Sequence, residues 1–327
     1  MTKRIKILFG TMFSIGIIFL ILITLYVNKF LNSVIIENKL IYVEKGSGLN
    51  ILVNKLYKDK IINNKILFNV IVRIKTKNKP VIKYGEYFIK KDSTIADLIK
   101  DIINNNIYYR TITFAEGLSN DSILKMIDTN EYLSGKIPDS IPEGSLLPQT
   151  YKFQRGDTKE DLVKRMQNDM LKVIDRYWDS RDKDLPFNTK REALILASIV
   201  EKETGIEEER RLVASVFVNR LRIRMPLQSD PTAIYGYTFG NVAREKDIKT
   251  YFLIRRDSPY NTYKIRGLPP GPICNPGEES IKAVLNPAKT KYLFFVATGN
   301  GGHNFSETYF EHRKMVNDFK NVVRGLK

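Results

Sequence analysis

The sequence predicts an α+β protein with an N-terminal transmembrane helix, a small αβ region, and a larger, mainly helical domain with long loops. Three observations lead to this prediction. One uncharged run near the N-terminus is long enough to cross a bilayer. Short strand and helix patterns alternate up to about residue 114, and longer helical patterns joined by proline-rich and glycine-rich segments follow from about residue 144.

Composition excludes several classes of protein. The 327 residues are 43% hydrophobic, which is enough for a sizeable core and excludes a wholly disordered chain. Lys and Arg number 53 against 36 Asp and Glu, so polyanions or an anionic surface are the favoured partners. Cys274 is the only cysteine, and His303 and His312 are the only histidines. We therefore predict no disulfide, no metal site and no cofactor.

The first element is the run from Ile7 to Val27, which is 21 residues long and carries no charge. At 1.5 Å per residue it spans the hydrocarbon of a membrane, and it is longer than the apolar part of a cleaved signal peptide, the alternative reading. Basic residues precede it at Lys3, Arg4 and Lys6. The positive-inside bias keeps residues 1–6 in the cytoplasm and places residues 28–327 outside the cell membrane. That location argues against nucleic acid as a partner.

Residues 28–110 follow as a small αβ region. A strand pattern leads to a turn at Gly46-Ser47-Gly48, and two helical patterns come next. This order resembles a LysM-like glycan-binding module, although a purely structural αβ domain fits equally well. A further strand, a helix capped by Ser93 or Thr94, and a strand over residues 108–114 complete the region.

The helix predicted over residues 190–204 carries two candidate acids, Glu201 and Glu203. Its apolar stripe contains Leu196, Ile199 and Val200. Helical spacing places Glu203 on this buried face and Glu201 on a more polar neighbouring face. A carboxyl held against apolar groups keeps its proton near neutral pH and can act as a general acid. The alternative is that both carboxylates are solvated or paired with Arg210 and Arg211.

Five motifs carry a resemblance to a known family. They are EGSLLPQTY (143–151), LASIVEKETG (196–205), ERRLVASVFVNRLRIRMPLQSDPTAIYGY (209–237), SPYNTYKIRGLPPGPICNPG (258–277) and GGHNF (301–305). In these segments the chain resembles the MltG, or YceG-like, family of membrane-anchored endolytic peptidoglycan transglycosylases. The resemblance covers nearly the whole chain and implies a catalytic domain over residues 111–327, related to goose-type lysozyme and soluble lytic transglycosylase domains.

The resemblance also implies a reaction. One glutamate in a Glu-Ser or Glu-Thr context is catalytic, and Glu203-Thr204 matches that context better than Glu201-Lys202. Such enzymes cut nascent glycan strands between N-acetylmuramic acid and N-acetylglucosamine and leave a 1,6-anhydro end. The resemblance further suggests peptidoglycan synthases as partners and a role in ending strand elongation. Two alternatives remain, a non-catalytic membrane-anchored wall-binding protein and a hydrolytic muramidase.

Polar and aromatic residues in two loops are the candidate sugar-binding groups, because amides, hydroxyls and rings commonly contact sugars. The loops are LQSDPT (227–232) and PYNTY (259–263). We expect substrate contacts from Gln228, Asp230, Thr232, Asn261 and Tyr263. The alternative is that these residues only shape the loops, since Asp230-Pro231 is also a helix-start signal. His303 is read either as a base or as a turn residue.

Overall fold

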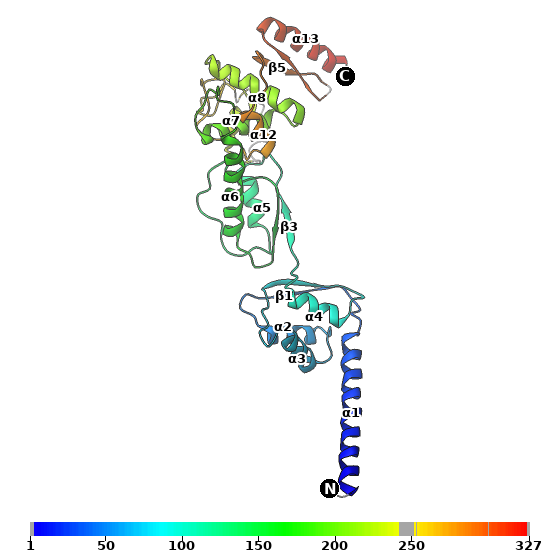
Figure 1. Ribbon diagram of the computed structural model, residues 1–327. Helices are drawn as coiled ribbons and strands as arrows, with labels where there is room; N and C mark the ends of the chain where they lie inside the picture. The colour runs from blue at the N-terminus through cyan, green and yellow to red at the C-terminus, as the bar shows by residue number, and fades with distance from the viewer. Residues whose placement is uncertain (1–2, 242–251, 253, 300, 326–327) are drawn as a thin grey trace. The chain divides into compact units, whose positions relative to one another are not determined.

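The computed structural model of the protein describes residues 3–241, 252, 254–299 and 301–325 (Figure 1). The chain divides into two compact units. Unit 1 contains residues 1–110 and 152–157, and unit 2 contains residues 111–151 and 158–327. Helices and short two-stranded sheets make up both units, which confirms the predicted mixture of helix and strand.

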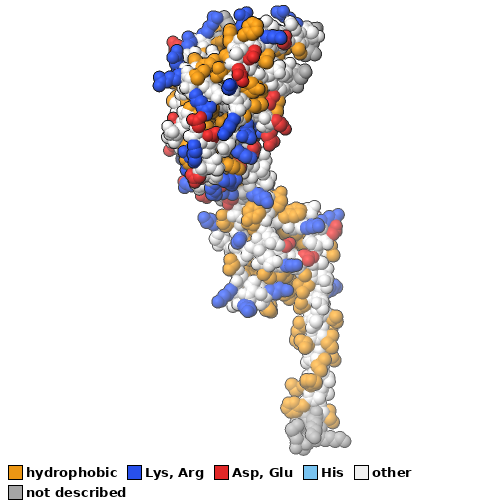
Figure 2. All heavy atoms as spheres, turned by 45° about the horizontal axis from the view of Figure 1, so that its top comes forward, with side chains coloured by type: hydrophobic (Ala, Val, Ile, Leu, Met, Phe, Trp, Pro, Cys, Tyr) orange, Lys and Arg blue, Asp and Glu red, His pale blue; other side chains and the backbone are white. Residues whose placement is uncertain are grey.

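The first helix, α1, runs over Lys3–Leu31, four residues beyond the predicted end at Val27. Its segment Ile7–Leu31 is 25 residues long, and no side chain of its most apolar window is buried. Orange side chains cover this helix in Figure 2. By length and composition α1 can cross a membrane. The helix continues past Val27 because Phe30, near its C-terminal end, packs into the core of unit 1.

Unit 1 has the order β1 (Lys39–Val43), α2 (Leu49–Lys58), α3 (Lys65–Lys75), β2 (Gly85–Ile89) and α4 (Ile95–Ile103). The strands β1 and β2 pair antiparallel, with Lys39 opposite Ile89 and Val43 opposite Gly85. Thr94 caps α4 and forms a capping box with Asp97, as the sequence pattern predicted for one of two residues. The LysM-like identity of this region stays a prediction, as do the predicted domain boundaries.

The core of unit 1 gathers aliphatic and aromatic side chains from all of these elements, including Leu56, Phe68, Tyr87 and Ile102. The segment 152–157 is tied to it by charge. Glu86 is 2% exposed, accepts a hydrogen bond from Arg110 Nε at 2.7 Å, and lies 3.6 Å from Arg155 Nη1. A buried carboxylate with two guanidinium partners fixes these chain segments next to the sheet.

The division between the units falls within β3 (Arg110–Thr113) and β4 (Thr150–Phe153), which pair as a two-stranded sheet. Two helices follow from unit 2, α5 (Asn120–Asp128) and α6 (Lys159–Trp178). Ser119 and Thr158 cap them by accepting hydrogen bonds from backbone N–H groups three residues later. The sequence indicates a helix around residues 157–181, which contains α6, and a helix capped within residues 119–121, where α5 begins.

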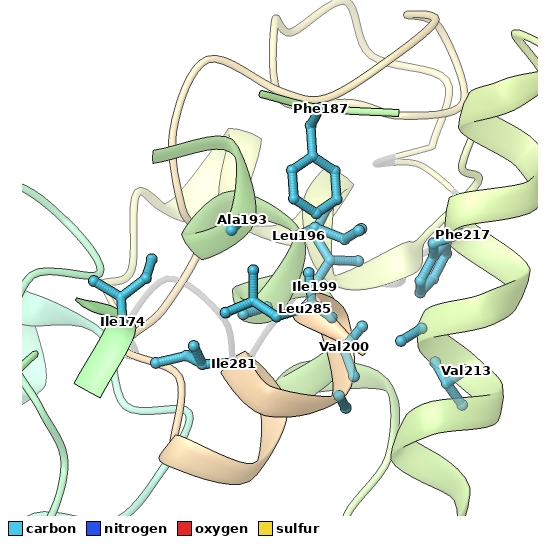
Figure 3. Packing of buried hydrophobic residues seen from close by; sticks show 14 of the residues in the cluster. Ile174, Phe187, Ala193, Leu196, Ile199, Val200, Val213, Phe217, Ile281 and Leu285 are labelled. Carbon is cyan, nitrogen blue, oxygen red and sulfur yellow. The ribbon is translucent and has the colours of Figure 1, made fainter. Parts of the chain in front are cut away.

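The centre of unit 2 is α7 (Lys190–Glu203), which packs against α8 (Glu207–Arg222) and α12 (Glu278–Leu285). Figure 3 shows Leu196, Ile199 and Val200 of α7 packed between Phe217 of α8 and Leu285 of α12. A capping box of Thr189 and Glu192 begins α7. The extended backbone of Thr204 ends the helix directly after Glu203.

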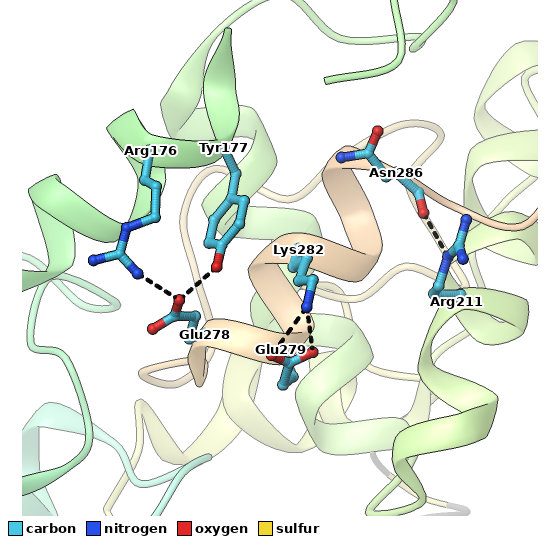
Figure 4. Close-up of polar contacts among 7 residues, drawn as sticks. All are labelled: Arg176, Tyr177, Arg211, Glu278, Glu279, Lys282 and Asn286. Carbon is cyan, nitrogen blue, oxygen red and sulfur yellow. Dashed lines mark hydrogen bonds and ion pairs between the residues drawn. The ribbon is translucent and has the colours of Figure 1, made fainter. Parts of the chain in front are cut away.

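Polar contacts join the outer ends of three helices of unit 2 (Figure 4). Glu278 of α12 accepts hydrogen bonds from Arg176 at 2.8 Å and from the Tyr177 hydroxyl at 2.6 Å, both on α6. Arg211 of α8 donates to the carbonyl oxygen of Asn286 at 2.9 Å. These contacts fix α12 between α6 and α8, and so hold the packing around α7.

The remaining elements stand near the C-terminal end of α7. They are α9 (Asp230–Thr238), β5 (Phe294–Ala297), β6 (His303–Ser306) and α13 (Tyr309–Gly325). The strands β5 and β6 form an antiparallel hairpin in which Ala297 faces His303. Helix α13 packs against this hairpin, and β5 also contacts α8.

Candidate active site

A pocket of about 380 Å³ opens in unit 2 beside the C-terminal end of α7. Its walls come from α7, α8, the loop before α9, the loop after residue 259, the β5–β6 hairpin and α13. The lining residues are Glu203, Arg220, Leu227, Gln228, Asp230, Tyr263, Phe294, Phe295, Val296, Ala297, His303, Tyr309 and His312. Segments far apart in the sequence therefore meet around one carboxyl group.

Glu203 is the last residue of α7 and lies half-buried in the wall of this pocket. Burial raises the pKa of its carboxyl from 4.5 to about 7, because surrounding protein disfavours the charged form. The Ser229 hydroxyl, which donates to Glu203 Oε1 at 2.5 Å, opposes this rise. The charge of Asp230 adds to it, while His303 and Arg220 act against it. Glu203 thus holds its proton over part of the neutral range and can both give and take one.

Ser229 is fixed by a buried network of hydroxyls. Its backbone N–H donates to Thr262 Oγ1 at 3.0 Å, and its carbonyl accepts from Thr232 Oγ1 at 2.6 Å. The two threonine hydroxyls lie 2.8 Å apart. Sequence reasoning did not select Ser229, although it stands in the LQSDPT segment. Only the packed loops show which hydroxyl of that segment reaches the acid.

Asp230 and Tyr263 form a second polar group on the pocket wall. The Tyr263 hydroxyl donates to Asp230 Oδ1 at 2.6 Å, and the Asp230 side chain is exposed. Burial and the neighbouring carboxylate raise the pKa of Tyr263 far above its ordinary value, so it stays a hydrogen-bond donor. Both residues were predicted from the sequence as sugar contacts, and both face the pocket.

Gln228 also faces the pocket, from a left-handed backbone conformation with φ of +51°. Its backbone N–H donates to the Thr262 carbonyl at 3.1 Å, which holds the residue in place. Such a conformation costs energy for a residue with a side chain and persists only where its surroundings enforce it. The exposed amide is thereby presented at the pocket mouth.

Thr232 and Asn261, the other two predicted sugar contacts, are buried behind the wall. They are 0% and 1% exposed, and neither lines the pocket. Thr232 supports Ser229 as described, and Asn261 Nδ2 donates to the carbonyls of Ile254 at 3.0 Å and Arg256 at 2.7 Å. Their polar groups are satisfied by the loops, so the structure places both as supports of the loops that carry Ser229 and Tyr263.

Arg220 is a functional neighbour that sequence reasoning missed. It is 7% exposed, and its guanidinium donates to the carbonyls of Leu293 and Leu227, each at 2.7 Å. It joins α8 to two walls of the pocket and lowers the pKa of Glu203 through its charge. The sequence of α8 contains several arginines and does not indicate which of them is buried. That depends on which segments cover the helix in the fold.

His303, read from the sequence either as a base or as a turn residue, lines the pocket at the start of β6. Its Nδ1 lies 2.6 Å from Glu209 Oε2, and its backbone N–H donates to Glu209 Oε1 at 2.8 Å. Glu209 of α8 therefore orients the imidazole from outside the pocket. The oriented imidazole faces the pocket that Glu203 also lines, and it lowers the pKa of Glu203.

Glu201 lies on a face of α7 that the fold covers, and its side chain is only 6% exposed. Of the two alternatives for this carboxylate, solvation is wrong and pairing with Arg210 is observed. Glu201 Oε2 accepts from the backbone N–H of Gly277 at 2.9 Å, and Oε1 lies 4.0 Å from Arg210. The segment that leads into α12 covers this face of α7, which the helical pattern alone could not indicate. Glu201 does not line the pocket and anchors that segment instead.

Cys274 takes no part in the pocket, and potential metal ligands form no cluster among the described residues. Cys274 is 1% exposed and lies 3.3 Å from the carbonyl oxygen of Ser198, as expected for a packed, unreactive thiol. Burial raises its pKa well above the ordinary range. Within residues 3–241, 252, 254–299 and 301–325, no group of three or more His, Cys, Asp or Glu side chains has the arrangement of a metal site.

The chain is similar to a known family over most of its length. The profile of the YceG-like family matches residues 41–318. The endolytic murein transglycosylase of Bacillus subtilis (strain 168) is 31% identical over 306 residues, which cover 84% of this chain and 82% of that protein. The endolytic murein transglycosylase of Streptococcus pneumoniae (strain D39) is 30% identical over 329 residues, which cover 87% of this chain and 58% of that protein.

A solved structure is also similar. The crystal structure of a YceG-like protein from Listeria monocytogenes has 30% sequence identity and a TM-score of 0.51, and the match covers 85% of this chain and 99% of that one. Sequence and fold thus agree over most of the length of both units. The chain belongs to the YceG-like family, whose relatives in B. subtilis and S. pneumoniae are endolytic murein transglycosylases.

Proposed function

We propose that the protein is an endolytic lytic transglycosylase that cleaves peptidoglycan glycan strands between N-acetylmuramic acid and N-acetylglucosamine. The observation that carries the proposal is the position of Glu203, a half-buried acid with a pKa of about 7 on the wall of an open pocket. Membership of the YceG-like family and the names of the relatives support the same activity. On these grounds we assign the catalytic role to Glu203.

One carboxyl group serves both proton transfers of the proposed reaction. Glu203 gives its proton to the glycosidic oxygen as the bond from that oxygen to C1 of N-acetylmuramic acid breaks, and N-acetylglucosamine leaves as an alcohol. The new carboxylate then takes the proton of the sugar's own C6 hydroxyl while O6 bonds to C1. This closes the 1,6-anhydro ring without water, and Glu203 ends protonated as it began.

The neighbours of Glu203 suit each stage. While the acid is protonated, it is kept so by burial and by the charge of Asp230. Once it is ionised, the Ser229 hydroxyl, the positive charge of Arg220 and the nearby His303 stabilise the carboxylate. Gln228, Asp230 and Tyr263 present an amide, a carboxylate and a phenol to the pocket, and we assign these three residues to sugar binding.

Asp230 supports a second candidate, a hydrolytic muramidase. Ordinary glycosidases use two carboxyl groups, one as acid and one as base or nucleophile. Asp230 lines the same pocket as Glu203, and its charge acts on Glu203. Its Oδ1 is engaged by Tyr263, which favours a positioning role over that of a base. The two reactions differ in whether water enters the product.

We further propose that α1 anchors the protein in the cell membrane, with its N-terminus in the cytoplasm and the rest of the chain outside. The apolar length of α1 and the three preceding basic residues support this arrangement. The anchor would confine cleavage to strands near the membrane and could bring it beside peptidoglycan synthases, where cutting would end strand elongation. Unit 1 would add glycan binding if its LysM-like character holds.

Mass spectrometry of the products tests the activity. The full chain in detergent micelles is incubated with un-crosslinked glycan strands, and the released fragments are weighed. Fragments that end in 1,6-anhydro-N-acetylmuramic acid are expected, each lighter than the hydrolytic product by one water. Fragments with reducing ends would assign a muramidase. Intact strands that nevertheless bind the protein would assign a wall-binding protein without activity.

A further inference from the structure

We propose that α3 of unit 1 lies in the headgroup layer of the membrane that α1 crosses, with anionic lipid as its partner. The inference rests on the proposed anchor and adds a second contact to it. Three independent features of unit 1 carry it: an exposed apolar stripe on α3, a surplus of basic residues around that helix, and a direct link from α3 to the outer end of α1.

The apolar stripe consists of Ile66, Val70 and Ile74, which are 79%, 44% and 72% exposed. They are spaced four residues apart, so they follow one face of α3. The opposite face is used by the protein itself, since Phe68 and Val72 are fully buried in the core of unit 1. A helix that is apolar on both faces needs a second apolar environment for the exposed one.

Basic residues surround this stripe. Between residues 58 and 79 there are seven Lys or Arg side chains and one acidic residue, Asp59. The basic residues are Lys58, Lys60, Lys65, Arg73, Lys75, Lys77 and Lys79. Exposed aliphatic side chains next to basic ones are also visible on unit 1 in Figure 2. This combination is typical of helices that lie in the interface of an anionic bilayer, where basic residues are attracted to the lipid headgroups.

The link to α1 places this surface at the right depth. Asn64 caps α3 by accepting from the Leu67 backbone N–H at 2.9 Å, and its Nδ2 donates to the Tyr26 hydroxyl of α1 at 3.2 Å. Tyr26 lies near the outer end of the apolar span, where tyrosine is enriched at the boundary between hydrocarbon and water. The first turn of α3 therefore stands at the level of the membrane surface. Phe30, 5% exposed in the core of unit 1, fixes this arrangement.

A glycan strand is the competing occupant, because a groove of about 440 Å³ runs beside Ile66 and Val70. Its amides are already engaged with one another and with the basic residues. Asn69 Nδ2 donates to Asn50 Oδ1 at 2.6 Å, and Arg73 Nε donates to Asn69 Oδ1 at 2.7 Å. The exposed stripe is aliphatic, whereas sugar rings stack on aromatic faces. These contacts favour lipid over sugar.

Site-directed fluorescence on the full chain tests the proposal. Single cysteines are introduced by Ile66→Cys and Ile74→Cys, in a Cys274→Ala background, and carry an environment-sensitive dye. Phe88→Cys on β2, which is 45% exposed, is the matched control, and Ile15→Cys on α1 reports the anchor. The protein is reconstituted in vesicles of phosphatidylcholine with about one quarter phosphatidylglycerol. Quenchers are supplied either on the lipid chains or as iodide in water.

The expected result is that dyes at positions 66 and 74 are quenched by the lipid-borne quencher and protected from iodide, while the dye at position 88 shows the reverse. Lys75→Glu combined with Lys77→Glu should weaken the lipid quenching at position 74. Quenching at position 15 without any at positions 66 and 74 would overturn this inference and leave the anchor standing. No lipid quenching at position 15 would overturn both. A dye response to soluble glycan fragments but not to lipid would assign the surface to sugar.

Discussion

Ser229 and Asp230 are consecutive residues, yet they shift the pKa of Glu203 in opposite directions. The Ser229 hydroxyl donates to the carboxylate and so favours the charged form. The negative charge of Asp230 disfavours it. The balance sets the pH at which the acid loses its proton, and each contribution can be removed separately.

The proposed reaction begins with protonated Glu203, so activity should fall as pH rises through about 7. Ser229→Ala removes a bond to the carboxylate and should move this fall to higher pH. Asp230→Asn removes a repelling charge, keeps an acceptor for Tyr263, and should move it to lower pH. The measurement is the rate of fragment release between pH 5 and 9. Shifts of both variants in the same direction would contradict the assignment.

Glu143 is a second acid of unit 2 whose pKa burial raises, from 4.5 to about 7. It does not line the candidate active site, and its hydrogen bonds connect parts of unit 2. Its Oε1 accepts from the backbone N–H of Asn120 at 2.9 Å, at the start of α5, and its Oε2 accepts from the Tyr235 hydroxyl at 3.3 Å. The carboxyl thus joins the EGSLLPQTY segment to α5 and α9.

The raised pKa makes stability depend on pH. A carboxyl with a higher pKa in the folded state contributes stability that is present below pH 4.5 and is lost as pH rises toward 7. The loss is at most about 3 kcal/mol, less where water reaches the group. In Glu143→Gln the amide oxygen can still accept from Asn120 while Nε2 donates to the Tyr235 hydroxyl, and no charge is buried. The free energy of unfolding of this variant should therefore rise relative to that of the wild type between pH 5 and 8. Urea denaturation measures this, with the exposed Glu131→Gln as control. Equal slopes for the wild type and Glu143→Gln would refute it.

At the scale of single residues, the sequence predicts Glu203 as the acid but does not indicate its surroundings. Helical spacing and the Glu-Thr context both pointed to Glu203. The burial of Glu201, Thr232 and Asn261 depends on segments that are distant in sequence and cover them in the fold. A sequence does not distinguish polar loop residues that are exposed from polar loop residues that are buried, since both occur at turn signals.

At the scale of elements, α8 is the support of the pocket. Arg220 projects from its buried face and donates to two carbonyls, one before Gln228 and one before β5. Both acceptors lie outside the named helices and strands, Leu227 between α8 and α9 and Leu293 directly before β5. A single planar guanidinium therefore fixes two pocket walls relative to α8.

Arg220→Lys should lower both stability and activity. The ammonium is a compact donor that cannot serve both carbonyls in the geometry of the guanidinium, so at least one charged hydrogen bond is lost, worth about 1.5–3 kcal/mol. Arg222→Lys is the control, since Arg222 is an exposed partner of Asp184 and its exchange should cost less than about 1 kcal/mol. Thermal unfolding and fragment release are measured together. Equal losses from both variants would argue against the role of Arg220.

Most helices could be predicted at this scale because their signals are local. Capping residues marked the starts of α4 and α5, and apolar spacing marked α6 and α7 within a few residues. The β5–β6 hairpin and the packing of α13 on it were not predicted. The strand β5 is a short apolar run, FFVA, which periodicity alone cannot assign to strand or helix, and α13 has no buried residue that would mark a core-facing stripe.

At the scale of the whole molecule, α1 is both a candidate membrane span and part of unit 1. Its last turn brings Phe30 into a core that also contains Leu56 and Phe68. The point at which the helix is cut therefore decides the stability of what remains. Sequence reasoning ended the span at Val27 and gave no reason to keep the following turn.

Two truncations test this dual role. A protein that begins at residue 28 keeps Phe30 and should be soluble and folded. A protein that begins at residue 33 loses a buried phenylalanine, which costs about 3–5 kcal/mol, and unit 1 should unfold at a lower temperature. Calorimetry of the two proteins gives the comparison. Identical melting of unit 1 in both would show that the last turn of α1 is dispensable.

The most direct test of the proposed function is the exchange Glu203→Gln, compared with Glu208→Gln on the exposed first turn of α8. The amide still accepts the Ser229 hydrogen bond but cannot transfer protons. Release of fragments with 1,6-anhydro ends should therefore fall by about 10²–10⁴, while strand binding and the melting temperature remain close to the wild type. Glu208→Gln should cleave normally. Near-normal release by Glu203→Gln would contradict the proposal that this one acid carries out both proton transfers.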